Sequence, residues 1–127
     1  MVGLKTQNNG EIFNDYSGNT ATEEYAHAEG RGTDALGKFS HAEGKETTAE
    51  GEDSHAEGYN THAHGIHSHA EGWATYAEKY AHAEGVNAKA LGDASHAEGY
   101  KTEATGPYAH AEGRGTIAQG TAQHVQG

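Results

Sequence analysis

The chain has 127 residues, a net charge of −11 with neutral histidines, 19 glycines, one proline and no cysteine. The lack of cysteine excludes disulfides and thiolate metal sites, and the acidic charge argues against nucleic-acid partners. Leucine, isoleucine, valine and phenylalanine together number 11, too few for an ordinary globular core, and no apolar run is long enough for membrane insertion.

The first segment, residues 1–26, lies outside the regular pattern of the rest of the chain. Asn9-Gly10 is a turn signal between two short runs. The segment is also rich in apolar residues for so polar a chain: Leu4, Ile12, Phe13 and Tyr16. A solenoid needs a cap over the exposed sheet edge at its end. Residues 1–26 are therefore predicted to be an N-terminal cap; the alternative is a junction with a preceding domain.

Residues 27–127 form a repeat domain built on the tetrapeptide His-Ala-Glu-Gly. Seven copies begin at His27, His41, His55, His69, His82, His96 and His110, and a degenerate copy begins at His124. The copies are 14 residues apart, except for one interval of 13. A fixed short period indicates one structural unit stacked on itself.

Each 14-residue unit is predicted to contain two short strands and two turns. The unit reads H-A-E-G-x-x-T-x-A-x-G-x-x-S/A, and glycine recurs too often for a helix. We expect the two glycines to supply the positive φ angles of tight turns. The fold class predicted is thus all-β, a parallel β-solenoid with about 4.8 Å between successive coils.

Side-chain alternation assigns the faces of these strands. The Ser or Ala before the motif, the motif Ala, and the Thr and Ala of T-x-A are small enough to fill a narrow coil, so we expect them inside. The motif His and Glu then point outward. Other outward positions vary between copies, whereas these two recur, so contact with an identical chain is the most direct explanation. The predicted interface of a homotrimer comprises His27, Glu29, His41, Glu43, His55, Glu57, His69, Glu71, His82, Glu84, His96, Glu98, His110, Glu112 and His124.

The pattern S-x-A-x-G-x-x-T-x-A-x-G resembles the YadA-like head repeats of trimeric autotransporter adhesins. The resemblance covers roughly residues 17–127 and implies a left-handed parallel β-roll of three chains around one axis. In that family the residues facing the axis are usually aliphatic, whereas this chain has His and Glu. Arrays of His-Ala-Glu-Gly also resemble those in tail or surface proteins of phages and Gram-positive bacteria. The resemblance implies an extracellular, virion or cell-surface location.

The 13-residue interval begins at His69 and lacks the second glycine, because Ala77-Glu78-Lys79-Tyr80-Ala81 replaces A-x-G-x-x-S. One turn is predicted to be shorter there. Two interpretations stay open: a tolerated deletion, or a kink that forms a binding notch.

Enzymatic activity is not expected from this chain. His-x-Glu occurs in zinc deaminases, but their Pro-Cys-x-x-Cys element is absent, and so is His-Glu-x-x-His. An active site between chains, as in trimeric β-helix carbonic anhydrases, would need a unique site rather than identical copies. No cofactor is expected. The alternative function is metal binding, because three chains would stack rings of three histidines along the axis.

Two further sets of residues are candidate sites. His62 and His64 lie outside the repeat register and share one face of a strand, so they form an exposed metal site or a solvated pair. The residues directly after the motif glycine include the apolar set Tyr59, Trp73, Val86 and Tyr100, flanked by Arg31, Lys45 and Arg114. This column is either a ladder of stacked side chains or a receptor patch for a host-surface glycan or protein. The best-supported function is thus a structural and adhesive segment of a trimeric fibre.

Overall fold

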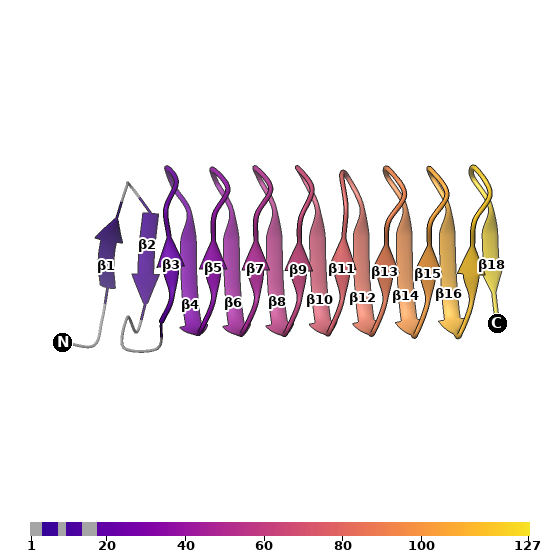
Figure 1. Cartoon of the computed structure of the whole chain (residues 1–127), viewed down its shortest axis with the longest axis horizontal. Helices are drawn as coiled ribbons and strands as arrows, with labels where there is room; N and C mark the ends of the chain where they lie inside the picture. Colours follow the sequence, from indigo (N-terminus) through magenta and orange to yellow (C-terminus); the bar gives the residue numbers. More distant parts are fainter. Residues whose placement is uncertain (1–3, 8–9, 14–17) are drawn as a thin grey trace.

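The computed structural model describes residues 4–7, 10–13 and 18–127, and of residues 4–13 it describes the backbone. The described part is all-β and forms a stack of flattened coils (Figure 1). Each coil contributes one long and one short strand, as predicted from the two-turn repeat. No helix long and apolar enough to cross a membrane occurs in this part of the chain.

The long strands form a ten-stranded sheet, here called the motif sheet. Each strand of this sheet from β4 to β16 holds one His-Ala-Glu-Gly copy and the residue after it. The strands are β1 (Leu4–Gln7), β2 (Gly10–Phe13), β4 (His27–Arg31), β6 (His41–Lys45), β8 (His55–Tyr59), β10 (His69–Trp73), β12 (His82–Val86), β14 (His96–Tyr100), β16 (His110–Arg114) and β18 (His124–Gln126).

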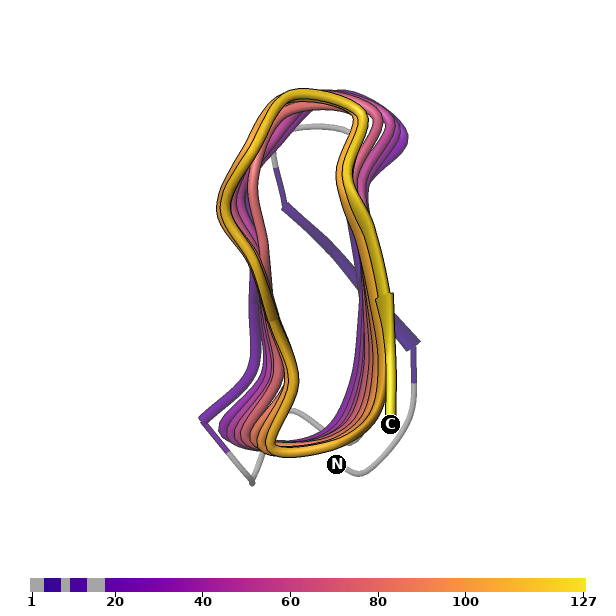
Figure 2. The ribbon, with the colours of Figure 1, turned by 90° about the vertical axis from the view of Figure 1, so that its right-hand side faces the viewer.

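The two-residue strands form an eight-stranded sheet, here called the short-strand sheet. Its strands are β3 (Thr20–Ala21), β5 (Asp34–Ala35), β7 (Thr48–Ala49), β9 (His62–Ala63), β11 (Tyr76–Ala77), β13 (Lys89–Ala90), β15 (Glu103–Ala104) and β17 (Ile117–Ala118). Viewed along the stack, the coils superpose into one narrow loop with a sheet on each long side (Figure 2).

Successive coils pair in parallel with every repeat position in register. His69 pairs with His55 on one side and with His82 on the other, and Glu71 does the same with Glu57 and Glu84. The 13-residue interval therefore leaves the motif register intact. Its missing residue is taken from the turn after Ala77, which confirms the shorter turn predicted there.

The interior of the coil is filled by small side chains, as the alternation predicted. The motif alanines Ala28, Ala42, Ala56, Ala70, Ala83, Ala97 and Ala111 have no exposed surface. The opposite wall consists of buried threonines such as Thr47 and alanines such as Ala49. Ser40, Ser54 and Ser68 close the ends of the coil, where each hydroxyl donates a 2.6 Å hydrogen bond to the carbonyl oxygen of the second glycine. A coil this thin has room for nothing larger.

The two glycines of each unit have different roles, and the expectation that both supply positive φ angles is wrong for the second. The motif glycines have φ between 110° and 118°. The second glycines lie outside the positive-φ region; at each of them except the last, Gly120, a side chain would overlap the backbone of the next coil. The left-handed turn positions are instead mostly held by other residues, such as Asp53 and Asn60, with φ near 55°.

The N-terminal strands extend the motif sheet without belonging to a regular coil. β1 and β2 form an antiparallel pair, and β2 pairs in parallel with β4, with Ile12 opposite Ala28. They depart from the outline shared by the coils (Figure 2). The short-strand sheet already begins at Thr20, so the first coil starts before the first motif. Asn9 and Tyr16 lie outside the described residues.

Candidate interaction face on the motif sheet

The outer face of the motif sheet carries parallel columns of histidine, glutamate and glycine. Each histidine and glutamate points out of the coil and is partly exposed from His27 to Glu112, as predicted. The in-register pairing of the coils stacks identical residues above one another. The whole predicted interface set is thus brought together on one continuous surface, with His124 at its more exposed C-terminal end.

The histidine rings form a stacked column. From His41 to His124, successive ring centroids lie 4.6–4.8 Å apart and the planes are within 6° of parallel. The first pair, His27 and His41, meets edge to face. Burial, and then the neighbouring histidines, lower the pKa of His41, His69 and His96 below the ordinary value, so the neutral form of these three rings is favoured.

Each glutamate lies beside the histidine of its own strand. The distances between Oε2 and Nε2 are 3.4–3.8 Å in all seven copies. From Glu71 onward, Oε1 also lies 3.4–4.0 Å from Nε2 of the next histidine. These distances suit ion pairs but are longer than good hydrogen bonds.

The histidine Nε2 atoms are enclosed but unsatisfied. Within the described part of the chain, this nitrogen has almost no exposed surface and no hydrogen-bond partner in His41, His55, His69, His82, His96 and His110. At the end of the column, His124 Nε2 does form a 3.4 Å hydrogen bond with Glu112 Oε1. An enclosed polar atom without a partner is costly, so this row of nitrogens is incomplete in a single chain.

The glutamates influence one another along the column. Hydrogen bonding with flanking carboxyl groups raises the pKa of Glu43 and of Glu71 to about 7. The same contacts lower the pKa of Glu29, Glu57 and Glu84. Carboxyl groups stacked this closely cannot all ionise without repulsion, so raised and lowered pKa values alternate over this part of the column.

A groove of about 1340 Å³ runs along the glutamate and glycine columns from Glu29 to Gly127. The glycines form its floor because a side chain there is impossible: a methyl group on Gly72 would overlap the carbonyl oxygen of Gly85. The same overlap recurs at each motif glycine. The absence of side chains leaves a channel that another chain can approach closely.

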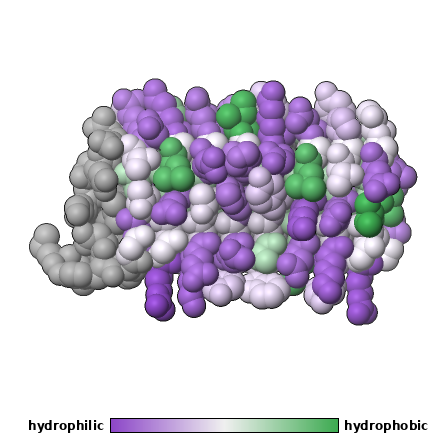
Figure 3. Space-filling model, viewed as in Figure 1, coloured by the Kyte–Doolittle hydropathy of each residue, from purple (hydrophilic) through white to green (hydrophobic). Residues whose placement is uncertain are grey.

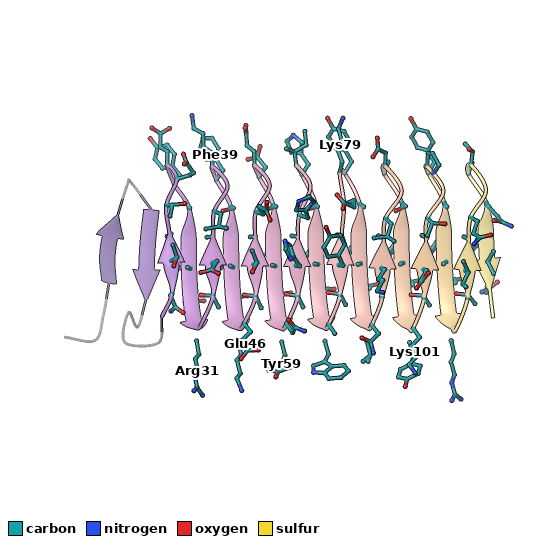
Figure 4. The ribbon with its side chains drawn as sticks, in the orientation of Figure 1. Arg31, Phe39, Glu46, Tyr59, Lys79 and Lys101 are labelled. Atoms are coloured by element: carbon teal, nitrogen blue, oxygen red, sulfur yellow. The ribbon has the colours of Figure 1, made fainter. Side chains whose placement is uncertain are left out.

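Beside the groove lies the column that contains Tyr59, Trp73, Val86 and Tyr100, which successive strands bring together as predicted. The rings of Tyr59 and Trp73 stack with centroids 6.4 Å apart. Lys45 lies over Tyr59, and Arg114 lies over Tyr100. Figure 4 shows Arg31, Tyr59 and Lys101 projecting from this edge of the coil stack. Tyr59, Trp73 and Tyr100 keep large exposed areas.

A second exposed ridge on the opposite edge was missed by the sequence analysis. Its residues precede the interior Ser or Ala, adopt positive φ, and include Tyr25, Phe39, His67, Tyr80 and Tyr108. Tyr25 stacks on Phe39 with centroids 5.2 Å apart. Figure 4 shows Phe39 and Lys79 on this edge. In the space-filling view of Figure 3, apolar side chains on the visible face form separate patches. Their shared position in the repeat was the signal in the sequence that could have revealed this ridge.

The motif sheet also presents candidate metal ligands. In five groups, a histidine, its glutamate and the next histidine each offer a ligand atom, and the three atoms lie within 4.8 Å of one another. The groups are centred on Glu29, Glu43, Glu71, Glu98 and Glu112. His62 and His64, the candidates outside the register, lie on the short-strand sheet, where both contact Glu50.

Comparison of the sequence with models of known protein families gives no match, and comparison with curated proteins gives no significant match.

Proposed function

We propose that this chain is a non-enzymatic structural and adhesive segment of a homotrimeric fibre, with three motif sheets facing a common axis. The fibre would adopt the left-handed β-roll that the repeat pattern implies. One observation carries the proposal: the outward histidine and glutamate recur together in seven coils, yet the enclosed Nε2 atoms of six of these histidines, His41 to His110, have no hydrogen-bond partner in the described part of the chain.

Three copies around an axis would supply the missing partners. Each coil level would bring three histidines and three glutamates together, so that a carboxylate of one chain meets an imidazole of the next. A ring of three closes through identical head-to-tail contacts and leaves no free interface. The glycine-floored groove supports this arrangement because it lets a neighbouring chain approach the backbone. A paired carboxylate and imidazole are far less costly to bury than either alone.

The repetition argues for a structural role rather than catalysis. An active site needs one arrangement of groups with distinct tasks, whereas these coils present the same pair many times over. Fibres of this kind belong outside the cell, on a cell surface or on a virion. The exposed column with Tyr59, Trp73 and Tyr100 offers aromatic faces and nearby cations, which suit a glycan or protein on a host surface.

Spin labels can test which face points to the axis, because the chain has no native cysteine. The matched positions are His55→Cys on the motif sheet and Thr48→Cys on the short-strand sheet, both half-buried in the single chain. The two sheets are about 10 Å apart, so in a three-fold ring the outer labels should be separated by about 17 Å more than the inner ones. Longer distances for the label at residue 55 would contradict the proposal.

Metal binding along the axis is the second candidate function, and the five compact His-Glu-His groups favour it. Thermal melting with and without a chelator separates the candidates. If interchain pairing holds the fibre, a chelator leaves the melting temperature unchanged and Glu57→Gln lowers it. A large chelator effect combined with an inert Glu57→Gln would instead support metal rings.

A further inference from the structure

The outer face of the short-strand sheet contains one cluster that the repeat does not explain. His62 and His64 project from β9 and the residue after it, and Glu50 and Glu78 occupy the position of His64 in the preceding and following coils. The residues at this position along the stack are Thr22, Leu36, Glu50, His64, Glu78, Leu91, Thr105 and Gln119. Polar, metal-ligating side chains therefore converge here and are bounded by leucine on both sides.

Glu50 lies between the two histidines. Its Oε2 is 3.1 Å from His62 Nε2, and its Oε1 is 3.6 Å from His64 Nε2. The two imidazole centroids are 5.6 Å apart, and the rings are inclined at 71°. Two imidazoles can span such a separation when both bind one ion through Nε2 at about 2.0–2.1 Å.

Glu78 contacts one ring nitrogen of His64 and so orients the imidazole. Its Oε2 lies 3.0 Å from Nδ1 of His64, while its Oε1 accepts a 2.9 Å hydrogen bond from the Tyr76 hydroxyl. A carboxylate beside Nδ1 favours a proton on that nitrogen, so Nε2, which faces Glu50 at 3.6 Å, is the nitrogen that a metal ion would bind. Carboxylate–histidine pairs of this kind orient the ligands of many metal sites.

We propose that His62, His64 and Glu50 bind one divalent transition-metal ion, with Glu78 and Tyr76 as positioning residues. Two imidazoles and a carboxylate suit zinc or copper, and water would fill the remaining positions. The ion would join two coils, since Glu50 comes from one and both histidines from the next. The adjacent coil is the 13-residue one, whose short turn directly follows Glu78. The site is on the opposite sheet from the motif histidines and does not depend on the proposed trimer.

Titration with Cu²⁺, followed through the broadening of backbone amide NMR signals, tests the site in the full chain. Copper is the probe because it binds nitrogen sites most tightly of the common divalent ions. The first equivalent should broaden signals around Ala49, Ala63 and Ala77 before those of the motif sheet. Glu78→Gln should weaken this binding by about ten- to a hundredfold, and His62→Ala or His64→Ala should weaken it more.

His67→Ala is the matched control, because His67 is exposed, lies three residues from His64 and contacts Asp53 instead of this cluster. It should leave the first binding event unchanged. The substituted side chains are all partly exposed, and a melting curve for each variant verifies that the coil stack is intact. Earlier broadening on the motif sheet, an unchanged titration in His64→Ala, or an equal loss in His67→Ala would overturn the proposal. An unchanged affinity in Glu78→Gln would overturn the role given to Glu78.

Discussion

The two sheets of the coil have the same kind of inner face and very different outer faces. Both inner faces consist of alanine with serine or threonine, because the coil is too narrow for more. Outside, the motif sheet repeats histidine and glutamate in seven coils, whereas the short-strand sheet changes from Asp34 to Thr48, His62, Tyr76 and Lys89 along one column. The geometry of the coil therefore dictates what lies inside and leaves the outer residues free.

The histidines of the two faces also differ in their partners. On the short-strand sheet, His62 and His64 are within 3.0–3.1 Å of a carboxylate oxygen of the same chain. On the motif sheet, the glutamates are farther from Nε2, and the enclosed nitrogens of six histidines have no hydrogen bond within the described residues. The histidines on the short-strand sheet thus have hydrogen-bond partners within one chain, and the six enclosed nitrogens on the motif sheet do not. The proposed trimer would account for this contrast.

The largest effect is expected at the motif glycines, which the single coil itself requires. Gly72→Ala combines an unfavourable φ of 110° with overlap of the new methyl group and the next coil. We expect it to lower the free energy of unfolding by at least about 3 kcal/mol. Gly115→Ala is the control, since its φ is also positive but the space around it is open; it should cost about 1–2 kcal/mol. Equal losses in denaturant unfolding would show that backbone overlap does not matter.

A smaller effect is expected for overfilling the interior. Ala49 is fully buried, and Thr48, its neighbour on β7, points outward. Ala49→Leu should destabilise the chain by about 1–3 kcal/mol because the coil cannot expand. Thr48→Leu should change stability by less than about 0.5 kcal/mol. Thermal melting of the two variants tests the face assignment, and a more damaging Thr48→Leu would reverse it.

Features that depend on one strand alone could be predicted from the sequence, whereas features that depend on contact between coils were harder to predict. The alternation of His-Ala-Glu assigns the faces, because alternation is a property of one strand. The second glycines were misinterpreted, because what they avoid is the backbone of the next coil. The cluster around His64 was recognised in part: Glu50 and Glu78 lie one repeat before and after it, so the 14-residue spacing already contained that signal. The aromatic ridge with Tyr25 and Phe39 depends on turn conformations that sequence alone does not specify.

The smallest effect concerns pH. Glu43 and Glu71 have pKa values of about 7 in the fold, above the ordinary value of 4.5. Their contribution to stability is thus fully present below about pH 4.5 and is lost as the pH rises through 7. The double variant Glu43→Gln, Glu71→Gln should gain stability relative to wild type between pH 5 and 8. Because these side chains are about one-third exposed, we expect less than about 1 kcal/mol for each.

Glu57→Gln provides the opposite case, and thermal melting at several pH values measures both sets of variants. The pKa of Glu57 is lowered by its flanking glutamates, so its contribution is present above pH 4.5 and is lost as the pH falls. This variant should therefore lose stability relative to wild type at pH 8. Parallel pH profiles for the two sets of variants would contradict the alternation of raised and lowered glutamate pKa values along the column.

The central claim is that the face of His and Glu columns is completed by two further copies of the chain. The most direct test is the mass of the full chain in solution, measured by light scattering at micromolar concentration with a chelator present. The account predicts a stable particle of three times the 13.3 kDa chain mass, because the interface needs no metal. A stable particle with the mass of a single chain would contradict it.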